Sequence, residues 1–431
     1  MSHDRASGGE QPGGTSTDVA AAMALIERMV ADCPRRQACS ASERRAQQIV
    51  AAEFERLDLA TEWREFRFSR DLYSVLALHF GVGTLGSLVA RRAPLAGLAL
   101  HLLAGGSYWA DSTHRGQLLR RLRPAGRSQN LLATIAATAP IELRVVVAAH
   151  VDAALTGLMF RPEVVRRLHE TPTPRWAAAL DRPLAAVTHS QLLLAGLDAV
   201  QWLAGRPLRG TGWLRLALSL PGLLGLLLTT EIVHRDEVVP GASDDLSGVA
   251  AAVMLAQRLR GRLPPSVEMV FAITGAEEAG LGGARALAAS GRWDPACTVV
   301  LGLDTLSGGE LKYFEEGEIA PVPVPPWLEA LVEKCAAAEP RFATIERFTV
   351  PVGHTDVFAF RRRGFDGLCL GAVDPSLGAP RNYHLPSDGP AELDPGELGL
   401  AIDFAEQLLL AIVEHRLAGR ASRGAPRGAL P

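Results

Sequence analysis

Four short runs of β-forming residues divide the chain, and each is followed by a turn with polar side chains. The runs are LRVVVAA at 143–149, VEMVFAIT at 267–274, TVVLGL at 298–303 and DGLCLGA at 366–372. Helical segments lie between them, notably from 246 and from 282. Strands that alternate with helices predict an α/β fold with a mostly parallel central sheet, covered by helices on both faces.

The composition fits a large folded domain that does not bind nucleic acid. The 431 residues include 44 basic and 47 acidic side chains, so the formal net charge is -3 and a basic nucleic-acid footprint is missing. Hydrophobic residues make up 48% of the chain, which supports a sizeable core. The five cysteines have no CxxC spacing, so they indicate neither a disulfide framework nor a sulfur-ligated zinc site.

Two hydrophobic insertions are expected to interrupt the α/β domain. We predict that the domain comprises residues 18–70, 128–160 and 239–415, and that the insertions comprise 71–111 and 161–238. Residues 1–17 and 416–431 are rich in turn-forming and polar residues, so they are expected to be a disordered leader and tail. The leader lacks the apolar core of a signal peptide.

The insertions contain four long apolar segments. Residues 72–90 and 93–110 contain no Asp, Glu, Lys or Arg, and 183–204 and 213–233 are nearly as apolar. A transmembrane helix needs about 20 apolar residues, so the segments predict two transmembrane hairpins with membrane lipid as a partner. The alternative is that the hydrophobic hairpins are buried in a large soluble core or in a dimer interface.

The orientation in the membrane follows from the loop charges. Two hairpins return the chain to the side it left, so the α/β domain should lie on one face. Arginines also occur in the opposite loops, at 91, 92, 206 and 209. The flank after the first hairpin is richer in arginine, which favours the cytoplasm: it carries Arg115, Arg120, Arg121, Arg123 and Arg127. We therefore expect a membrane-associated protein whose α/β domain is on the cytoplasmic face.

Acidic and histidine side chains follow the ends of the predicted strands. Because the carboxyl ends of parallel strands share one edge, these side chains should converge, and a cation would relieve the repulsion among the carboxylates. Two imidazoles and three carboxylates, one of them shared, suit a pair of zinc or similar divalent ions. The residues at this edge are His150, Asp152, Asp244, Asp245, Glu277, Glu278, Asp304 and His384.

Each of these residues has a structural explanation when it is taken alone. Asp244 and Asp245 could cap the helix that follows them. The pair at 277–278 could be a solvated turn, Asp304 could cap a turn, and a single histidine could be a buried structural residue. Their shared placement at one edge favours a metal site over several independent structural roles.

The same residues carry a resemblance to a known family. The chain has His-Val-Asp at 150–152, Gly-Ala-Ser-Asp-Asp-Leu-Ser-Gly at 241–248, Glu-Glu at 277–278, Asp at 304 and Asn-Tyr-His at 382–384. In order and spacing it resembles the M28 metallopeptidases, the co-catalytic zinc aminopeptidases. The resemblance covers roughly residues 20–70 and 128–415, apart from the second insertion.

The resemblance implies a position for each ligand. Five side chains would bind two zinc ions: Asp244 as the bridge, Glu278 and His384 at one ion, and His150 and Asp304 at the other. Asp152 would hold the imidazole of His150 through its carboxylate, which fixes the tautomer.

The resemblance also implies the chemistry. Glu277 would be the general base that takes a proton from a metal-activated water. Tyr383 would donate to the tetrahedral oxyanion. The implied activity is that of an aminopeptidase, which hydrolyses N-terminal residues from a peptide substrate.

One motif departs from the family pattern. The family often has Ser-Asp-His-x-x-Phe before the last strand, whereas this chain has Thr-Asp-Val-Phe-Ala-Phe at 355–360, so we expect altered substrate contacts at an intact site.

Two alternative functions use the same fold. One is a glutaminyl-cyclase-like acyl transferase with one zinc, and the other is a non-catalytic membrane scaffold. The pair of His150 and Asp304 favours two metals and hydrolysis, and Glu277 argues against the scaffold because a binding module needs no base.

Overall fold

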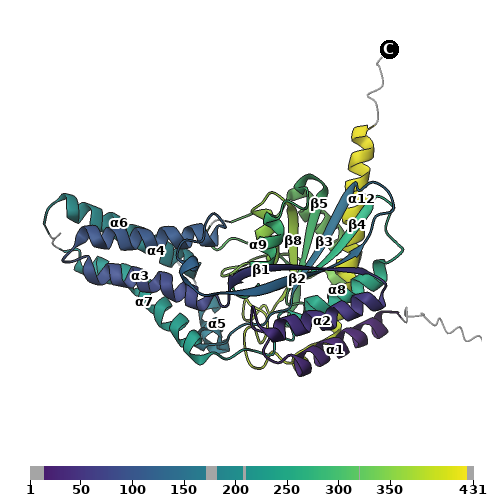
Figure 1. Cartoon of the computed structure of the whole chain (residues 1–431), viewed down its shortest axis with the longest axis horizontal. Coiled ribbons are helices and arrows are strands. Elements are labelled where there is room, and N and C mark those ends of the chain that lie inside the picture. Colours follow the sequence, from purple (N-terminus) through teal and green to yellow (C-terminus); the bar gives the residue numbers. More distant parts are fainter. Residues whose placement is uncertain (1–13, 171–181, 207–209, 320, 425–431) are drawn as a thin grey trace, which may run out of the picture.

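One mixed β-sheet forms the centre of the α/β domain (Figure 1). The computed structural model describes residues 14–170, 182–206, 210–319 and 321–424. Over these residues eight strands lie in the order β1-β2-β4-β3-β5-β8-β6-β7. Their bounds are β1 Ala60–Ser69, β2 Ala125–Ile135, β3 Leu143–His150, β4 Val267–Thr274, β5 Thr298–Leu303, β6 Glu310–Glu315, β7 Arg347–Thr349 and β8 Asp366–Val373.

The four predicted runs are the four parallel strands at the centre of the sheet. In register, Val147 of β3 lies between Phe271 of β4 and Leu301 of β5, and β8 pairs parallel with β5. These strands are buried along nearly their whole length, as expected for a sheet covered on both faces. The α/β class is confirmed. The sheet as a whole is mixed, because β2 joins β4, and β6 joins β8, in antiparallel pairs.

Helices cover both faces of the sheet. One face packs against α1 (Gly14–Asp32), α2 (Ala41–Arg56), α8 (Leu246–Leu259), α10 (Pro326–Ala338) and α12 (Pro395–Gly424). The other face packs against the shorter α9 (Gly282–Ala289) and α11 (Asp356–Arg361). Aromatic contacts support both layers: Phe54 lies 5.9 Å from Phe271 on the first face, and Trp293 stacks on Phe360 at 6.1 Å on the second.

The two insertions form one helical bundle that projects away from the sheet (Figure 1). It consists of α3 (Tyr73–Val89), α4 (Pro94–Ser112), α6 (Pro183–Leu203) and α7 (Gly212–Arg235), and α5 (Pro162–Glu170) lies near its base. Helix α3 packs on α4 and α7, and α6 packs on α4 and α7. Among the described helices, α7 is the one long and apolar enough to cross a membrane by length and composition.

Polar contacts fix the base of the helical bundle to the α/β domain. Glu318 accepts hydrogen bonds from the hydroxyls of Tyr108, at 2.5 Å, and Ser112, at 2.7 Å. At the end of α4, the Asp111 carboxylate accepts hydrogen bonds from Arg120 and Arg285. The base of the bundle is therefore held by buried hydrogen bonds and ion pairs as well as by the connecting chain.

Helical structure extends into both ends of the chain that were predicted to be disordered. Helix α1 begins at Gly14, inside the predicted leader 1–17, and α12 continues to Gly424, inside the predicted tail from 416. The alanines and leucines of 401–418 continue the helical pattern past the expected boundary. Residues 1–13 and 425–431 lie outside the described residues.

Candidate metal centre

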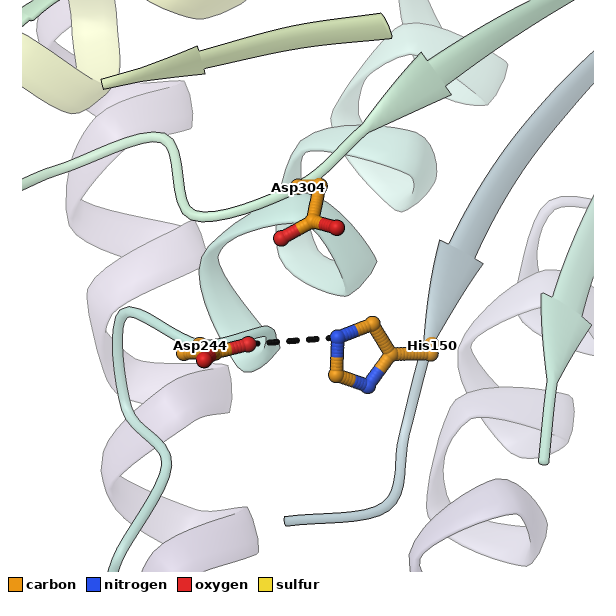
Figure 2. Close-up of side chains that lie close together, drawn as sticks. All are labelled: His150, Asp244 and Asp304. Carbon is orange, nitrogen blue, oxygen red and sulfur yellow. Dashed lines mark ion pairs between the residues drawn. The ribbon is translucent and has the colours of Figure 1, made fainter. Parts of the chain in front are cut away.

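The predicted acidic and histidine side chains meet beyond the carboxyl ends of the parallel strands (Figure 2). His150 is the last residue of β3, Asp304 directly follows β5, and Asp244 lies in the loop before α8. The His150 Nε2 atom is 3.2 Å from Asp244 Oδ1. Three elements that are far apart in sequence thus direct their polar side chains into one space.

Asp244 is shared by two groups of potential ligands. Its other oxygen, Oδ2, lies 3.2 Å from His384 Nε2, which is 3.4 Å from Glu278 Oε1. Within each of two triads the ligand atoms lie within 4.8 Å of one another: His150, Asp244 and Asp304 form the first, and Asp244, Glu278 and His384 the second. One carboxylate therefore faces two separate positions for a cation.

Glu277 lies beside the first triad. Its Oε2 atom is 3.8 Å from His150 Nε2, and its side chain is buried. Burial, and then the charges of Glu278, Asp356 and Asp304, raise the pKa of Glu277 well above its usual range, although the charge of His150 opposes the shift. A buried carboxyl group with a raised pKa beside other titratable groups is typical of functional sites.

The electrostatics of the site fit a bound cation. Burial raises the pKa of Asp304 to about 7, with a further contribution from Asp244 against the effect of His150. Burial lowers the pKa of His384, but Glu278 and Asp244 raise it to about 10. Apart from its contact with His384, Glu278 Oε1 is buried without a hydrogen bond from the described chain. These carboxylates carry negative charge that the surrounding chain does not fully balance. Together with the imidazoles they are suitable ligands for a divalent metal ion.

Asp245 and Asp388 hold the loop that presents Asp244. Asp245 caps α8 by accepting the Gly248 N–H at 3.0 Å, and it also accepts the N–H of His150. Asp388 accepts the N–H groups of Ser243 and Asp244 at 2.8 and 3.1 Å. The capping explanation thus applies to Asp245, whereas the side chain of Asp244 points into the site.

Asp152 makes different contacts from those expected. Its carboxylate accepts the N–H groups of Glu277 and Glu278, both at 3.0 Å, and lies 3.8 Å from His150 Nδ1. The atom within hydrogen-bonding distance of Nδ1 is the Asp152 backbone oxygen, at 3.1 Å. The expected partner of the imidazole is therefore corrected from the carboxylate to the carbonyl, because the turn after β4 occupies the carboxylate. A proton on Nδ1 still leaves Nε2 free for a metal.

Arg36 was not identified from the sequence. Its guanidinium is fully buried and donates to the backbone oxygens of Val151, at 3.0 Å, and of Pro240, at 2.7 Å. It therefore ties the loop after β3 to the loop that carries Asp244. An isolated arginine in a chain with many arginines gave no signal for this role.

Three aromatic side chains pack around His384 and form a wall of the site. The rings of Tyr383 and Phe160 lie 4.0 and 4.6 Å from its imidazole. Tyr73, the first residue of α3, places its hydroxyl 3.4 Å from His384 Nδ1. Tyr73 and Glu278 also line one narrow cleft. Tyr73 and Phe160 were not predicted, because Tyr73 lies in the first insertion and Phe160 directly precedes the second, and the sequence indicates only that these insertions are hydrophobic.

The motif at 355–360, which departs from the family pattern, lies close to the site. The Asp356 carboxylate accepts a hydrogen bond from Thr274 at the end of β4. Val357 is fully buried, and its side chain lies against Gly302 of β5. The nearby His354 ring stacks on Phe358 with centroids 3.8 Å apart, so it packs as a buried aromatic residue.

Comparisons with known proteins identify a family match and several structures with a similar fold. Residues 230–409 match the model of peptidase family M28, and no curated protein matches the sequence. Similar solved structures include a Zn-dependent exopeptidase from Parabacteroides distasonis, with 13% identity and a TM-score of 0.53 over 92% of this chain and 97% of that one. A zinc aminopeptidase from Bacillus subtilis has 13% identity and a TM-score of 0.52, over 91% of this chain and 94% of that one.

A third similar structure is a glutaminyl cyclase from an Acidobacteriales bacterium, with 14% identity and a TM-score of 0.52 over 96% of this chain and 99% of that one. At these identities the likeness shows a shared fold. The match to the model of peptidase family M28 over residues 230–409 confirms the resemblance that the sequence motifs carry.

Proposed function

We propose that this protein is a zinc-dependent aminopeptidase that removes N-terminal residues from peptides. The observation that carries the proposal is the pair of ligand triads that share Asp244, with Glu277 beside them. Two cation positions that share one carboxylate would suit a hydrolase that uses two metal ions to cleave one scissile bond.

The residues present fit two zinc ions. His150 and Asp304 would hold one ion, Glu278 and His384 the other, and Asp244 both. Bound zinc would supply Lewis acidity and lower the pKa of a water molecule in the site. The buried Asp152 and Asp388 carboxylates hold the backbone that carries these ligands, which keeps the donor atoms in place when substrate enters.

The remaining groups handle protons and charge. Glu277 would accept a proton from the attacking water and pass it to the leaving amine, a role supported by its burial and raised pKa. Tyr383, stacked on His384, would donate from its hydroxyl to the oxygen that develops negative charge in the tetrahedral transition state.

A glutaminyl cyclase is the second candidate, because solved cyclases share this fold over nearly the whole chain. Such an enzyme would use one zinc to close an N-terminal glutamine onto its own amine with release of ammonia. The complete His150, Asp244 and Asp304 triad favours the aminopeptidase, since a one-metal reaction leaves that triad without a function.

Metal content and product analysis separate the two candidates. Purified protein should contain two zinc ions per chain and should release the amino acid from a panel of aminoacyl-anilides. One zinc per chain, with pyroglutamyl product and ammonia from a glutaminyl peptide, would identify the cyclase instead. Stoichiometric zinc with no turnover of either substrate would contradict both enzymatic functions and would favour the non-catalytic membrane scaffold.

Tyr73→Phe is expected to weaken zinc binding about 10- to 100-fold, because the variant removes the hydroxyl that faces His384 Nδ1. Its ring contact with Phe160 remains. The measurement is zinc retention during titration with a competing chelator. Tyr108→Phe is the matched control, because that buried hydroxyl binds Glu318 and no metal ligand. Equal zinc retention in the two variants would mean that Tyr73 only packs.

A further inference from the structure

The outer surface of the helical bundle is unusually apolar. The described residues include 24 exposed large hydrophobic side chains, and 18 of them lie on α3, α4, α6 and α7. They include Trp213, with 82% of its surface exposed, and Leu203, with 76%. Soluble proteins rarely expose a continuous apolar surface of this kind unless another component covers it.

The interior of the helical bundle is polar. Asp198 of α6 accepts a hydrogen bond from Arg215 of α7, and its other oxygen lies 2.8 Å from Nδ1 of His101 in α4. The network continues through the second ring nitrogen of His101 to Ser87 of α3, at 3.1 Å, and then to Ser219 of α7, at 2.8 Å. All four helices contribute to it, and Asp198 and His101 are completely buried. The bundle thus has its polar groups inside and its large apolar groups outside.

Small residues allow the helices to approach closely. Gly83 of α3, Gly105 of α4 and Gly222 of α7 all face the side chain of Gln191 in α6, and a Cβ atom at any of them would crowd it. Gly225 faces Phe80 in the same way. Glycine at helix crossings, with interhelical hydrogen bonds from polar side chains, is how helices associate in lipid.

The dimensions of the helical bundle match a bilayer. The four helices have 17, 19, 21 and 24 residues, or about 26 to 36 Å at ~1.5 Å per residue, against about 30 Å of hydrocarbon. Exposed tryptophans lie at both ends: Trp202 and Trp213 are far from the α/β domain, and Trp109 is near it. Aromatic residues are enriched at both membrane interfaces.

We propose that the helical bundle spans a lipid bilayer, with the α/β domain in the water on one side and residues 90–93, 204–206 and 210–211 on the other. Acyl chains are the occupant that fits, because exposed apolar side chains lie on all four helices, whereas a second copy of the chain would cover one side. Helix α7 is not the core helix of a soluble protein. Such a helix would be mostly buried, whereas only 17% of the most apolar stretch of α7 is buried.

Charge placed on the outer surface tests the proposal. Leu224 and Leu227, near the middle of α7, are exposed, so Leu224→Lys with Leu227→Lys would be harmless in water. In a bilayer the same pair should reduce stable insertion by about 10⁴-fold, which would be measured as loss of the full-length chain from the membrane fraction. Leu118→Lys with Leu122→Lys, equally exposed outside the bundle, is the matched control. Equal membrane retention of the two double variants would overturn the proposal.

Chemical labelling of the two ends of the helical bundle distinguishes a bundle that spans the bilayer from one that lies flat on its surface. Single cysteines at Arg92→Cys, in the far loop, and at Leu118→Cys, near the α/β domain, would be introduced into a chain with Cys39→Ser and Cys297→Ser, and reconstituted into sealed vesicles. With a membrane-impermeant maleimide, the fractions labelled before lysis should be complementary, because each molecule exposes one end. Full labelling of both positions before lysis would contradict the spanning arrangement.

Discussion

Glu277→Gln is expected to lower kcat by about 10² to 10⁴ while zinc content stays unchanged. Glutamine has nearly the same shape as glutamate but cannot accept the proton of the attacking water. A loss of this size corresponds to about 3 to 5 kcal/mol in the activation barrier. The measurement is the steady-state rate on an aminoacyl-anilide, made with metal analysis of the same sample.

Glu392→Gln is a suitable control for this experiment, since Glu392 is exposed on the surface of the α/β domain. It should leave both kcat and zinc content unchanged. If Glu277→Gln lost zinc as well as activity, then Glu277 would be acting as a ligand, an arrangement in which it groups with His150 and Glu278.

Asp244→Asn is expected to remove both metal ions and all measurable hydrolysis. Asp244 contributes one oxygen to each triad, and a neutral amide cannot balance two divalent charges. The loop should survive the change, because it is held by hydrogen bonds from the backbone N–H groups of Ser243 and Asp244 to Asp388. Zinc per chain, determined by elemental analysis after gel filtration, is the measurement.

Asp304→Asn supplies the comparison for Asp244→Asn. Asp304 belongs to one triad, so its replacement should remove one ion and leave the second. If Asp304→Asn left the zinc content unchanged at one per chain, the site would hold a single metal and the cyclase would become the better assignment.

The central sheet and most of the candidate site could be predicted because the signals are local. The Val-, Ile- and Leu-rich runs that became β3, β4 and β5 are buried on both faces, so their composition alone identifies them. The carboxyl ends of adjacent parallel strands then bring His150, Glu277 and Asp304 together, whatever the loops between them do.

Contacts made by the insertions could not be predicted. Tyr73 and His384 are 311 residues apart, and nothing in an uncharged segment indicates which aromatic ring will reach a histidine. The role of Asp152 depended on which of its atoms faced His150: the backbone oxygen lies 3.1 Å from Nδ1 and the nearest carboxylate oxygen 3.8 Å. A sequence pattern does not determine differences of this size.

The helical bundle illustrates the same limit. The lengths of its apolar segments predicted helices that associate with one another. Whether Asp198 and Arg215 would face outward or toward each other depended on the rotation of each helix. The same composition would also have allowed a bundle with an apolar interior.

If the helical bundle is the membrane anchor that we propose, the contact between Tyr73 and His384 links the candidate site directly to that anchor. When an anchor is joined to an enzyme by a flexible linker, cleavage of the linker can release a working enzyme. Here Tyr73 begins the first bundle helix and also touches a predicted zinc ligand. Phe160, directly before the second insertion, lies against the rings of both residues. Cleavage that removed the bundle would therefore also dismantle the wall of the catalytic site. Under both proposals, a form of the α/β domain released from the bundle by proteolysis should be inactive.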